Sequence, residues 1–409
     1  MFKKIFTIVK LNGLIRELET GSRFDPQRSQ VIRQLGQLGD PRAIEYLSRE
    51  LELPNLYAHK YEEIAEEIIA ALAHIGGEKA IATLIGVLDH PSHRVREATL
   101  AVLHHWNWMP QSPLEIVKYA IAMGDWQTAL TASDTSHEKN ALIGFIGKLP
   151  YTSERLNAIQ SLSELGDERA LDIFLQELDY LSKREAQKED DPQTKKHTRI
   201  SAIRGIASIQ GFKDFYHLRL AIRGLIHVLG NPDFTKEYML EGDYKAEVAQ
   251  ALRRFRRQGF DQLVESLQIK DPQLRAARVE ALKAFPGAET RRILVNMLAD
   301  PDARVRREVI LAMKEFECPE LAEPLAMRLA SRSEQDPAPL RELVARLTSI
   351  LAKYASTLPT EVLETVTNLP EKFSAHIMFE PGDWYDEDIS SLTIISFAKG
   401  EIERRQRPT

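Results

Sequence analysis

The strongest constraint on this chain is a motif that returns along it in a fixed register. The pattern apolar–Gly–x–x–basic–Ala–apolar starts at Leu38, again at Ile75 and again at Leu165. Further apolar residues keep their places after each copy, while the positions between them vary. A fixed apolar register predicts an array of similar units, each of which buries its apolar face only by stacking on its neighbours.

The residues of the motif predict a helical hairpin. Gly39 and Gly166 follow an apolar helical stretch, and glycine ends helices because it adopts the left-handed conformation without a steric penalty. Asp40 and Asp167 come next, and aspartate favours the first position of a new helix. Each unit therefore consists of two helices joined by a short turn.

A second, tighter series runs through the C-terminal half. Phe255, Phe285 and Phe316 are almost evenly spaced, and Leu263, Leu294 and Leu325 follow with the same spacing. The turns at Asp271-Pro272 and Asp300-Pro301 are separated by nearly the same distance along the chain. A period of about 30 with two helices in each unit is typical of an α-solenoid.

These motifs resemble a known repeat family. Leu38-Gly39-Asp40-Pro41-Arg42-Ala43 resembles the HEAT-like repeat of phycobilisome lyases, and the Asp-Pro turn before Arg304-Val305-Arg306 resembles HEAT repeats in general. The resemblance covers roughly residues 28–355. It implies an all-α protein, a right-handed α-solenoid of HEAT-like helical hairpins, and we expect an irregular C-terminal cap to close it.

Breaks in the pattern divide the chain. The expected parts are an N-terminal capping helix (1–27), repeats over 28–180 with an irregular unit near 104–135, a polar loop (181–199), further repeats (200–355) and a C-terminal cap or tail (356–409).

In the tail, Phe373–Phe379 and Leu392–Phe397 are short apolar runs that suggest one hairpin. The acidic, aromatic segment 380–388 lies between them. We interpret this region as a protective cap, with a partner-binding or self-inhibitory tail as the alternative.

Composition excludes several kinds of chemistry. The formal charge is −6, which argues against a generally basic nucleic-acid binder. Cys318 is the one cysteine, so neither a disulfide within the chain nor a cysteine zinc site is possible, and a reducing, cytoplasmic location fits. The apolar run before Lys10 is too short for a signal peptide, and no stretch is long enough to span a membrane. We expect no cofactor, no metal site and no catalytic residue.

Three of the four tryptophans, Trp106, Trp108 and Trp126, lie close together in the sequence beside the irregular unit. Packing at an irregular junction explains them most simply. The functional alternative is an aromatic pocket for a partner, to which the neighbouring Asp125 and His105 could add polar contacts.

Residues 251–310 form a basic stretch with 13 Lys or Arg and 8 Asp or Glu, a net charge of +5. Arg253, Arg254 and Arg256 are nearly consecutive in it. Arg275, Arg304 and Arg306 occupy related places in successive repeats and could line one face for an acidic partner or phosphates. The alternative is that these arginines form salt bridges between repeats, with Asp271, Asp300 and Asp302 as partners.

We therefore expect a non-enzymatic scaffold that presents a concave surface to a protein partner, whose identity the sequence leaves open. One alternative, implied by the resemblance, is a bilin lyase or chromophore chaperone for phycobiliproteins, in which arginines pair with bilin propionates and tryptophans pack on the pyrrole rings. A further alternative, disfavoured by the net charge, is nucleic-acid binding through the 253–307 basic face.

Overall fold

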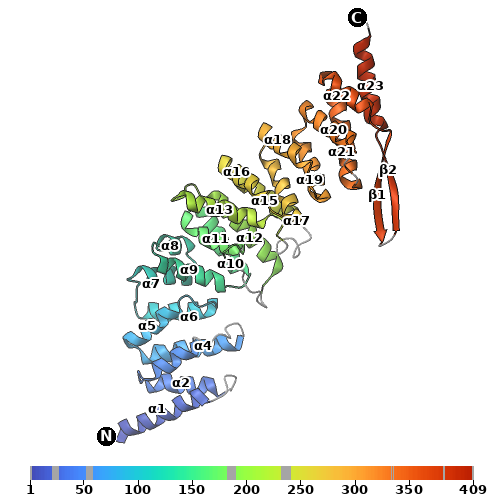
Figure 1. Ribbon diagram of the computed structural model, residues 1–409. Helices are drawn as coiled ribbons and strands as arrows, with labels where there is room; N and C mark the ends of the chain where they lie inside the picture. Colours follow the sequence, from blue (N-terminus) through green and yellow to red (C-terminus); the bar gives the residue numbers. More distant parts are fainter. Residues whose placement is uncertain are drawn as a thin grey trace. The chain divides into compact units, whose positions relative to one another are not determined.

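The computed structural model describes residues 2–20, 27–51, 59–181, 190–231, 241–332, 334, 336–380 and 383–407. The chain divides into two compact units, Met1–Gly211 and Phe212–Thr409. Almost every element in both is a helix (Figure 1), which confirms the predicted all-α solenoid of helical hairpins.

Unit 1 is built from hairpins whose helices form two layers. Helices α2, α4 and α6 lie side by side in one layer, and α3, α5, α7, α9 and α11 follow one another in the other; further along, α10 packs on α12, and the short α8 packs on α7 and α10. The elements of unit 1 are α1 (Phe2–Thr20), α2 (Arg28–Leu38), α3 (Ala43–Leu51), α4 (His59–Ile75), α5 (Gly77–Val87), α6 (His93–His105), α7 (Pro113–Met123), α8 (Trp126–Thr131), α9 (Ser136–Lys148), α10 (Ser153–Leu165), the 3₁₀ turn η1 (Glu168–Ala170), α11 (Leu171–Glu177) and α12 (Pro192–Ser208).

Unit 2 continues the same alternation. Helices α15, α17, α19 and α21 follow one another in one layer, and α20 packs beside α22 in the other. Its elements are α13 (Phe215–Val228), α15 (Glu241–Arg254), α16 (Arg256–Ser266), α17 (Pro272–Ala281), η2 (Leu282–Ala284), α18 (Ala288–Met297), α19 (Ala303–Met313), η3 (Lys314–Phe316), η4 (Pro319–Leu321), α20 (Ala322–Ala330), α21 (Pro337–Tyr354), η5 (Ala355–Thr357), α22 (Thr360–Thr367), β1 (Lys372–Glu380), β2 (Asp383–Ser390) and α23 (Leu392–Gln406).

The helix ends follow the local chemistry read from the motif. Gly39 and Gly166 have φ angles of 64° and 60°, the left-handed conformation that ends α2 and α10. The side chain of Asp167 accepts a hydrogen bond from the backbone N–H of Arg169 at 2.9 Å, and Asp40 accepts one from that of Arg42 at 3.0 Å. Both aspartates thereby satisfy an N–H group that the start of a helix leaves without a partner.

The phenylalanine series marks the turns inside the hairpins. Phe255 lies between α15 and α16, and Phe316 closes η3 at the equivalent place two repeats later. Both are buried, and Phe285, at the repeat between them, packs on Phe260 with ring centroids 5.6 Å apart. These residues are therefore evenly spaced because each turn contributes one large side chain to the shared core.

Two regions differ from the sequence-based expectation. Helix α12 begins at Pro192, so residues 192–199 are helical where a polar loop was expected over 181–199; Asp191 accepts a hydrogen bond from the N–H of Thr194 at 2.7 Å and caps the new helix. Residues 182–189 lie outside the described part. The boundary between the units falls later, after Gly211.

The C-terminal region contains the expected hairpin: its first strand includes the run Phe373–Phe379, but its second strand is not the run that was expected. Strands β1 and β2 pair antiparallel with Phe373 opposite Ile389, and both of these residues are buried near α21. The second apolar run, from Leu392, begins helix α23 rather than a strand: Ile394, Ile395 and Ala398 recur at helical spacing and are buried. Most of segment 380–388 belongs to β2, while residues 381–382 lie outside the described part.

Candidate functional site

The most irregular unit of the repeat array contains a groove. Helix α8 has 6 residues, whereas α6 and α10, which line the groove with it, have 13 each. At 1.5 Å per residue, α8 is about 10 Å shorter than its neighbours. Asp125 caps it by accepting hydrogen bonds from the N–H and the hydroxyl of Thr128, at 3.0 and 2.7 Å, so the aspartate is occupied in holding the helix start.

A cavity of about 700 Å³ opens beside this short helix. Its walls come from the N-terminal part of α6, the turn between α7 and α8, and one face of α10. We call it the α8 groove and define it by these residues: His93, Arg96, Ala122, Met123, Gly124, Trp126, Thr152, Ser153, Glu154, Asn157 and Ser161.

A partly buried ion pair between α6 and α10 lines the groove. Arg96 of α6 is 1% exposed and forms a close ion pair with Glu154 of α10. Its Nη1 also donates to the carbonyl oxygens of His90 and Pro91, at 2.7 and 2.9 Å. Burial lowers the pKa of Arg96, and the charge of Glu154 opposes this shift. The guanidinium lies 5.1 Å from the ring centroid of Phe145, which gives it an aromatic neighbour in place of water.

The three candidate tryptophans do not form one pocket. Trp126 lines the α8 groove, is 6% exposed and stacks on Phe145 with centroids 6.1 Å apart. Trp106 caps the opposite end of α6, and Trp108 packs against Tyr119 at 6.2 Å. Both are half-buried against the core of unit 1. Trp106 and Trp108 therefore pack against the core, and of the three tryptophans only Trp126 lines the groove.

One face of α10 carries a stripe of polar side chains that was not predicted from the sequence. Ser153, Asn157 and Ser161 are four residues apart, so they lie on one face of the helix, and all three line the groove. Their side chains make no hydrogen bond within the described part of the chain. The i, i+4, i+8 spacing is readable from the sequence, but such spacing on a helix usually marks a solvated face.

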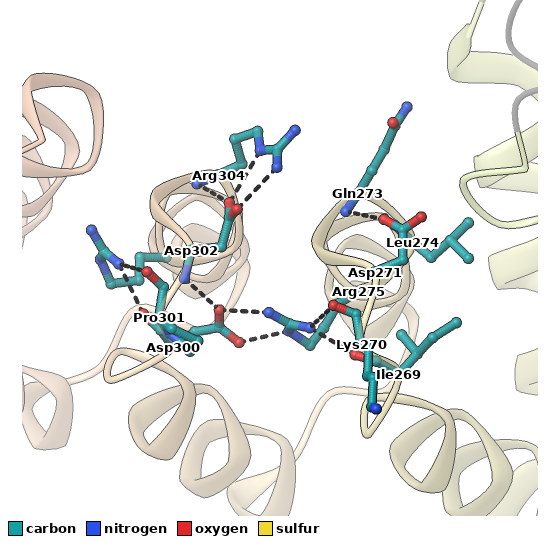
Figure 2. A network of polar contacts seen from close by, with 11 residues as sticks. Ile269, Lys270, Asp271, Gln273, Leu274, Arg275, Asp300, Pro301, Asp302 and Arg304 are labelled. Carbon is teal, nitrogen blue, oxygen red and sulfur yellow. Dashed lines mark hydrogen bonds and ion pairs between the residues drawn. The ribbon is translucent and has the colours of Figure 1, made fainter.

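The arginines of the basic stretch differ in their hydrogen-bond and ion-pair partners. Figure 2 shows Arg275 donating from Nε and Nη2 to Asp300, at 2.7 and 2.9 Å, and from Nη1 to the carbonyl oxygen of Ile269 at 2.7 Å. This hydrogen bonding to Asp300 raises the pKa of Arg275. The pair ties the turn before α17 to the turn before α19, as the salt-bridge alternative predicted.

Arg306 and Arg304 also have carboxylate partners. Arg306 donates to Glu334 at 2.5 and 2.8 Å and to the carbonyl oxygen of Asp300 at 2.8 Å. Arg304 bonds to Asp302, the cap of its own helix, and its side chain is 67% exposed (Figure 2). These arginines therefore stabilise turns and do not line a free cationic face.

Arg253, Arg254 and Arg256 are the exception. All three are exposed at the turn between α15 and α16 and have no ion-pair or hydrogen-bond partner in the described part. Near them in unit 2, Phe215 and Tyr216 are 62% and 68% exposed, a feature that the sequence analysis did not single out.

Within the described residues, no group of three or more His, Cys, Asp or Glu side chains is arranged to hold a metal ion. No helix in the same part of the chain combines the length and apolar character needed to cross a membrane.

Comparisons with known proteins bear on the repeats. A family model described as HEAT repeats matches residues 12–104, 241–314 and 260–338, which lie in both units. No curated protein matches the chain. Among solved structures, one described as the crystal structure of an engineered protein is 14% identical and covers 98% of this chain and 100% of its own, with a TM-score of 0.30.

Proposed function

Because this chain belongs to the HEAT-repeat proteins, we propose that it is a scaffold that binds a segment of a partner protein in the α8 groove. Repeat arrays offer extended surfaces on which single repeats can be modified without loss of the shared core. The observation that carries the proposal is the open cavity beside the short helix α8, which residues of α6, of the turn between α7 and α8 and of α10 line.

The lining of the groove favours a peptide in an extended conformation. A helical peptide satisfies its own backbone hydrogen bonds and is recognised mainly through an apolar stripe. An extended peptide presents free N–H and C=O groups, which need polar partners. The unpaired hydroxyl and amide groups of Ser153, Asn157 and Ser161 supply both donors and acceptors.

The spacing of that stripe also fits an extended chain. Residues four apart on a helix are about 6 Å apart along its axis. Alternate residues of an extended peptide are about 6.7 Å apart. The three α10 side chains thus reach alternate backbone groups of about four to five peptide residues that run along the helix.

The opposite wall supplies an apolar anchor. Met123 is 55% exposed at the end of α7, and Trp126 lines the same groove. Methionine adapts to side chains of different shapes, and tryptophan contributes strongly to binding energy at interfaces. An apolar side chain of the peptide is therefore expected to pack on Met123 while α10 binds the backbone.

A peptide-display selection against the full chain tests this function. The enriched peptides are measured by fluorescence anisotropy on the wild type and on Asn157→Arg, which fills the groove without touching the core. We expect at least a tenfold loss of affinity, about 1.4 kcal/mol. Gln160→Arg is the matched control, because Gln160 is exposed on the same helix but does not line the groove. Equal binding to both variants contradicts the proposal.

The other functions considered from the sequence have their own tests. A bilin lyase binds a compound that absorbs visible light, and nucleic-acid binding weakens steeply as salt increases. The nucleic-acid alternative uses the 253–307 face, in which the guanidinium groups of Arg275 and Arg306 are occupied by carboxylates. This occupation supports the protein-binding function over that alternative. The cytoplasmic location stays a prediction.

A further inference from the structure

A second surface, independent of the α8 groove, combines exposed aromatic rings with unpaired positive charge. The ring of Phe212 contacts that of Phe255, with centroids 5.8 Å apart, and this contact joins the start of α13 to the turn between α15 and α16. Side chains on both sides of the contact point into solvent. We call them the aromatic–arginine corner: Phe215, Tyr216, Arg253, Arg254 and Arg256.

The covalent chain keeps these residues close together. Arg254 and Arg256 are the neighbours of Phe255, so their Cα atoms lie about 3.8 Å from its Cα atom. Phe215 is three residues from Phe212, which limits the distance between their Cα atoms to about 11 Å. The backbone segments that carry the aromatic rings and the guanidinium groups therefore lie close together in unit 2.

The two aromatic residues are unusual in their exposure. Single large apolar side chains that are more than half exposed are common on protein surfaces. Two adjacent exposed aromatic residues form an apolar patch, and such patches typically bind a partner. They start α13, and the carboxylate next to them is occupied: Asp214 accepts hydrogen bonds from the N–H of His217 at 2.9 Å and pairs with its ring at 2.8 Å. The three arginines of the neighbouring segment have no carboxylate partner within the described residues.

We propose that the aromatic–arginine corner binds an acidic segment of a partner protein that also carries apolar side chains. Charge complementarity selects the acidic residues, since guanidinium groups bind carboxylates with strong, directional hydrogen bonds. The aromatic rings supply the apolar contact area that holds such a segment after the first encounter.

The surroundings favour a short acidic segment over a nucleic acid. The next arginine, Arg257, pairs with Asp261 at 2.8 Å and with Glu289 at 2.5 Å. Arg275, further along the unit, is held by Asp300. A long polyanion that leaves the corner in this direction meets paired charges and carboxylates, whereas a segment of a few residues needs only the corner itself.

The experiment uses a fluorescein-labelled twelve-residue peptide of alternating Glu and Leu, with a Glu–Ser peptide and a twelve-residue oligo-thymidylate as comparators. Anisotropy on the full chain is expected to detect binding of the Glu–Leu peptide that weakens with added salt. Two double variants, Phe215→Ala with Tyr216→Ala and Arg253→Gln with Arg254→Gln, should each weaken it at least tenfold.

The controls match each change. Met327→Ala removes another exposed apolar side chain, and Lys314→Glu changes another exposed charge of unit 2, and both should leave affinity within twofold. Asn157→Arg should also leave it unchanged, which separates this surface from the α8 groove. The proposal is overturned if the Glu–Leu peptide does not bind, if it binds the two double variants as well as the wild type, if the Glu–Ser peptide binds equally well, or if only the oligo-thymidylate binds.

Discussion

The guanidinium of Arg96 in α6 forms an ion pair with the carboxylate of Glu154 in α10, although the two residues are far apart in the sequence. Both residues line the cavity beside the short helix α8. The ion pair therefore joins two repeats at the groove that we propose as a binding site.

Replacing Arg96 with methionine is expected to lower the free energy of unfolding by about 3 kcal/mol. The substitution leaves the carboxylate of Glu154 and the carbonyl oxygens of His90 and Pro91 without their donor. The control is Arg94→Met, whose exposed ion pair with Glu66 should be worth less than about 1 kcal/mol. Urea unfolding followed by tryptophan fluorescence measures both, and equal losses contradict the assigned role of the buried pair.

The stability of the protein is expected to depend on the protonation of His90. Burial, followed by the charge of Arg96, lowers the pKa of this ring to about 4, while the neighbouring Ser92, Asp89 and Glu62 oppose the shift. An unfolded histidine titrates near 6.5, so the unfolded state binds more protons between pH 4 and 6.5. The contribution of the neutral ring is complete above pH 6.5 and is lost as the pH falls through 4.

His90→Asn tests this dependence. The Nδ1 atom of His90 accepts a hydrogen bond from the N–H of Ser92 at 3.1 Å, and the Asn side-chain oxygen can take its place without titrating. Between neutral pH and pH values below 4, the wild type should lose up to about 3 kcal/mol more stability than the variant. Parallel curves of unfolding free energy against pH for the two proteins refute the assignment.

Gly36 is expected to tolerate no side chain. A Cβ atom at this position lies 2.7 Å from the Cα atom of Ala71, because α2 and α4 pack directly on each other there. Gly36→Ala should destabilise the protein by about 1–3 kcal/mol through overpacking. Gly144→Ala is the control: it lies inside α9, a Cβ atom there meets nothing within 4 Å, and the change should be neutral or stabilising by up to about 1 kcal/mol. Thermal or urea unfolding decides, and the reverse order of stabilities rejects the close contact.

The arginines of the basic stretch should respond differently to lysine. Arg275→Lys loses the two-pronged bond to Asp300 and the contact with Ile269, because a lysine ammonium cannot reproduce the planar fork. We expect a loss of about 1–2 kcal/mol. Arg304→Lys, at an exposed site whose partner is its own helix cap, should change stability by less than about 0.5 kcal/mol. Similar effects at both positions argue against the inter-repeat role of Arg275.

Much of the repeat organisation could be predicted, because its signals are local. Gly39 and Gly166 end helices through their own backbone conformation, and Asp167 caps through a group two residues away. Phe255 and Phe316 recur because each turn adds the same side chain to a shared core. The run from Leu392 misled the analysis, since β-branched residues in a short apolar segment do not distinguish a strand from the buried face of a helix such as α23.

The candidate sites were only partly predictable. Trp126 lines the groove of the irregular unit, yet its neighbours in sequence, Trp106 and Trp108, lie at the other end of α6. Closeness along the chain is a poor guide across a helix about 20 Å long. The polar face of α10 and the exposed pair Phe215 and Tyr216 gave no distinct signal, because exposure depends on which other segments cover a residue.

The sequence by itself determined that this protein is an array of helical hairpins, since the period of its apolar residues and the residues at its helix ends act within a few positions of one another. Only the tertiary structure decided where a surface is open for binding. Whether an arginine is buried like Arg96, paired like Arg275 or unpaired like Arg253 depends on carboxylates that arrive from other repeats. The energy of a charge is set by its neighbours in space and its access to water, and neither is a property of the local sequence.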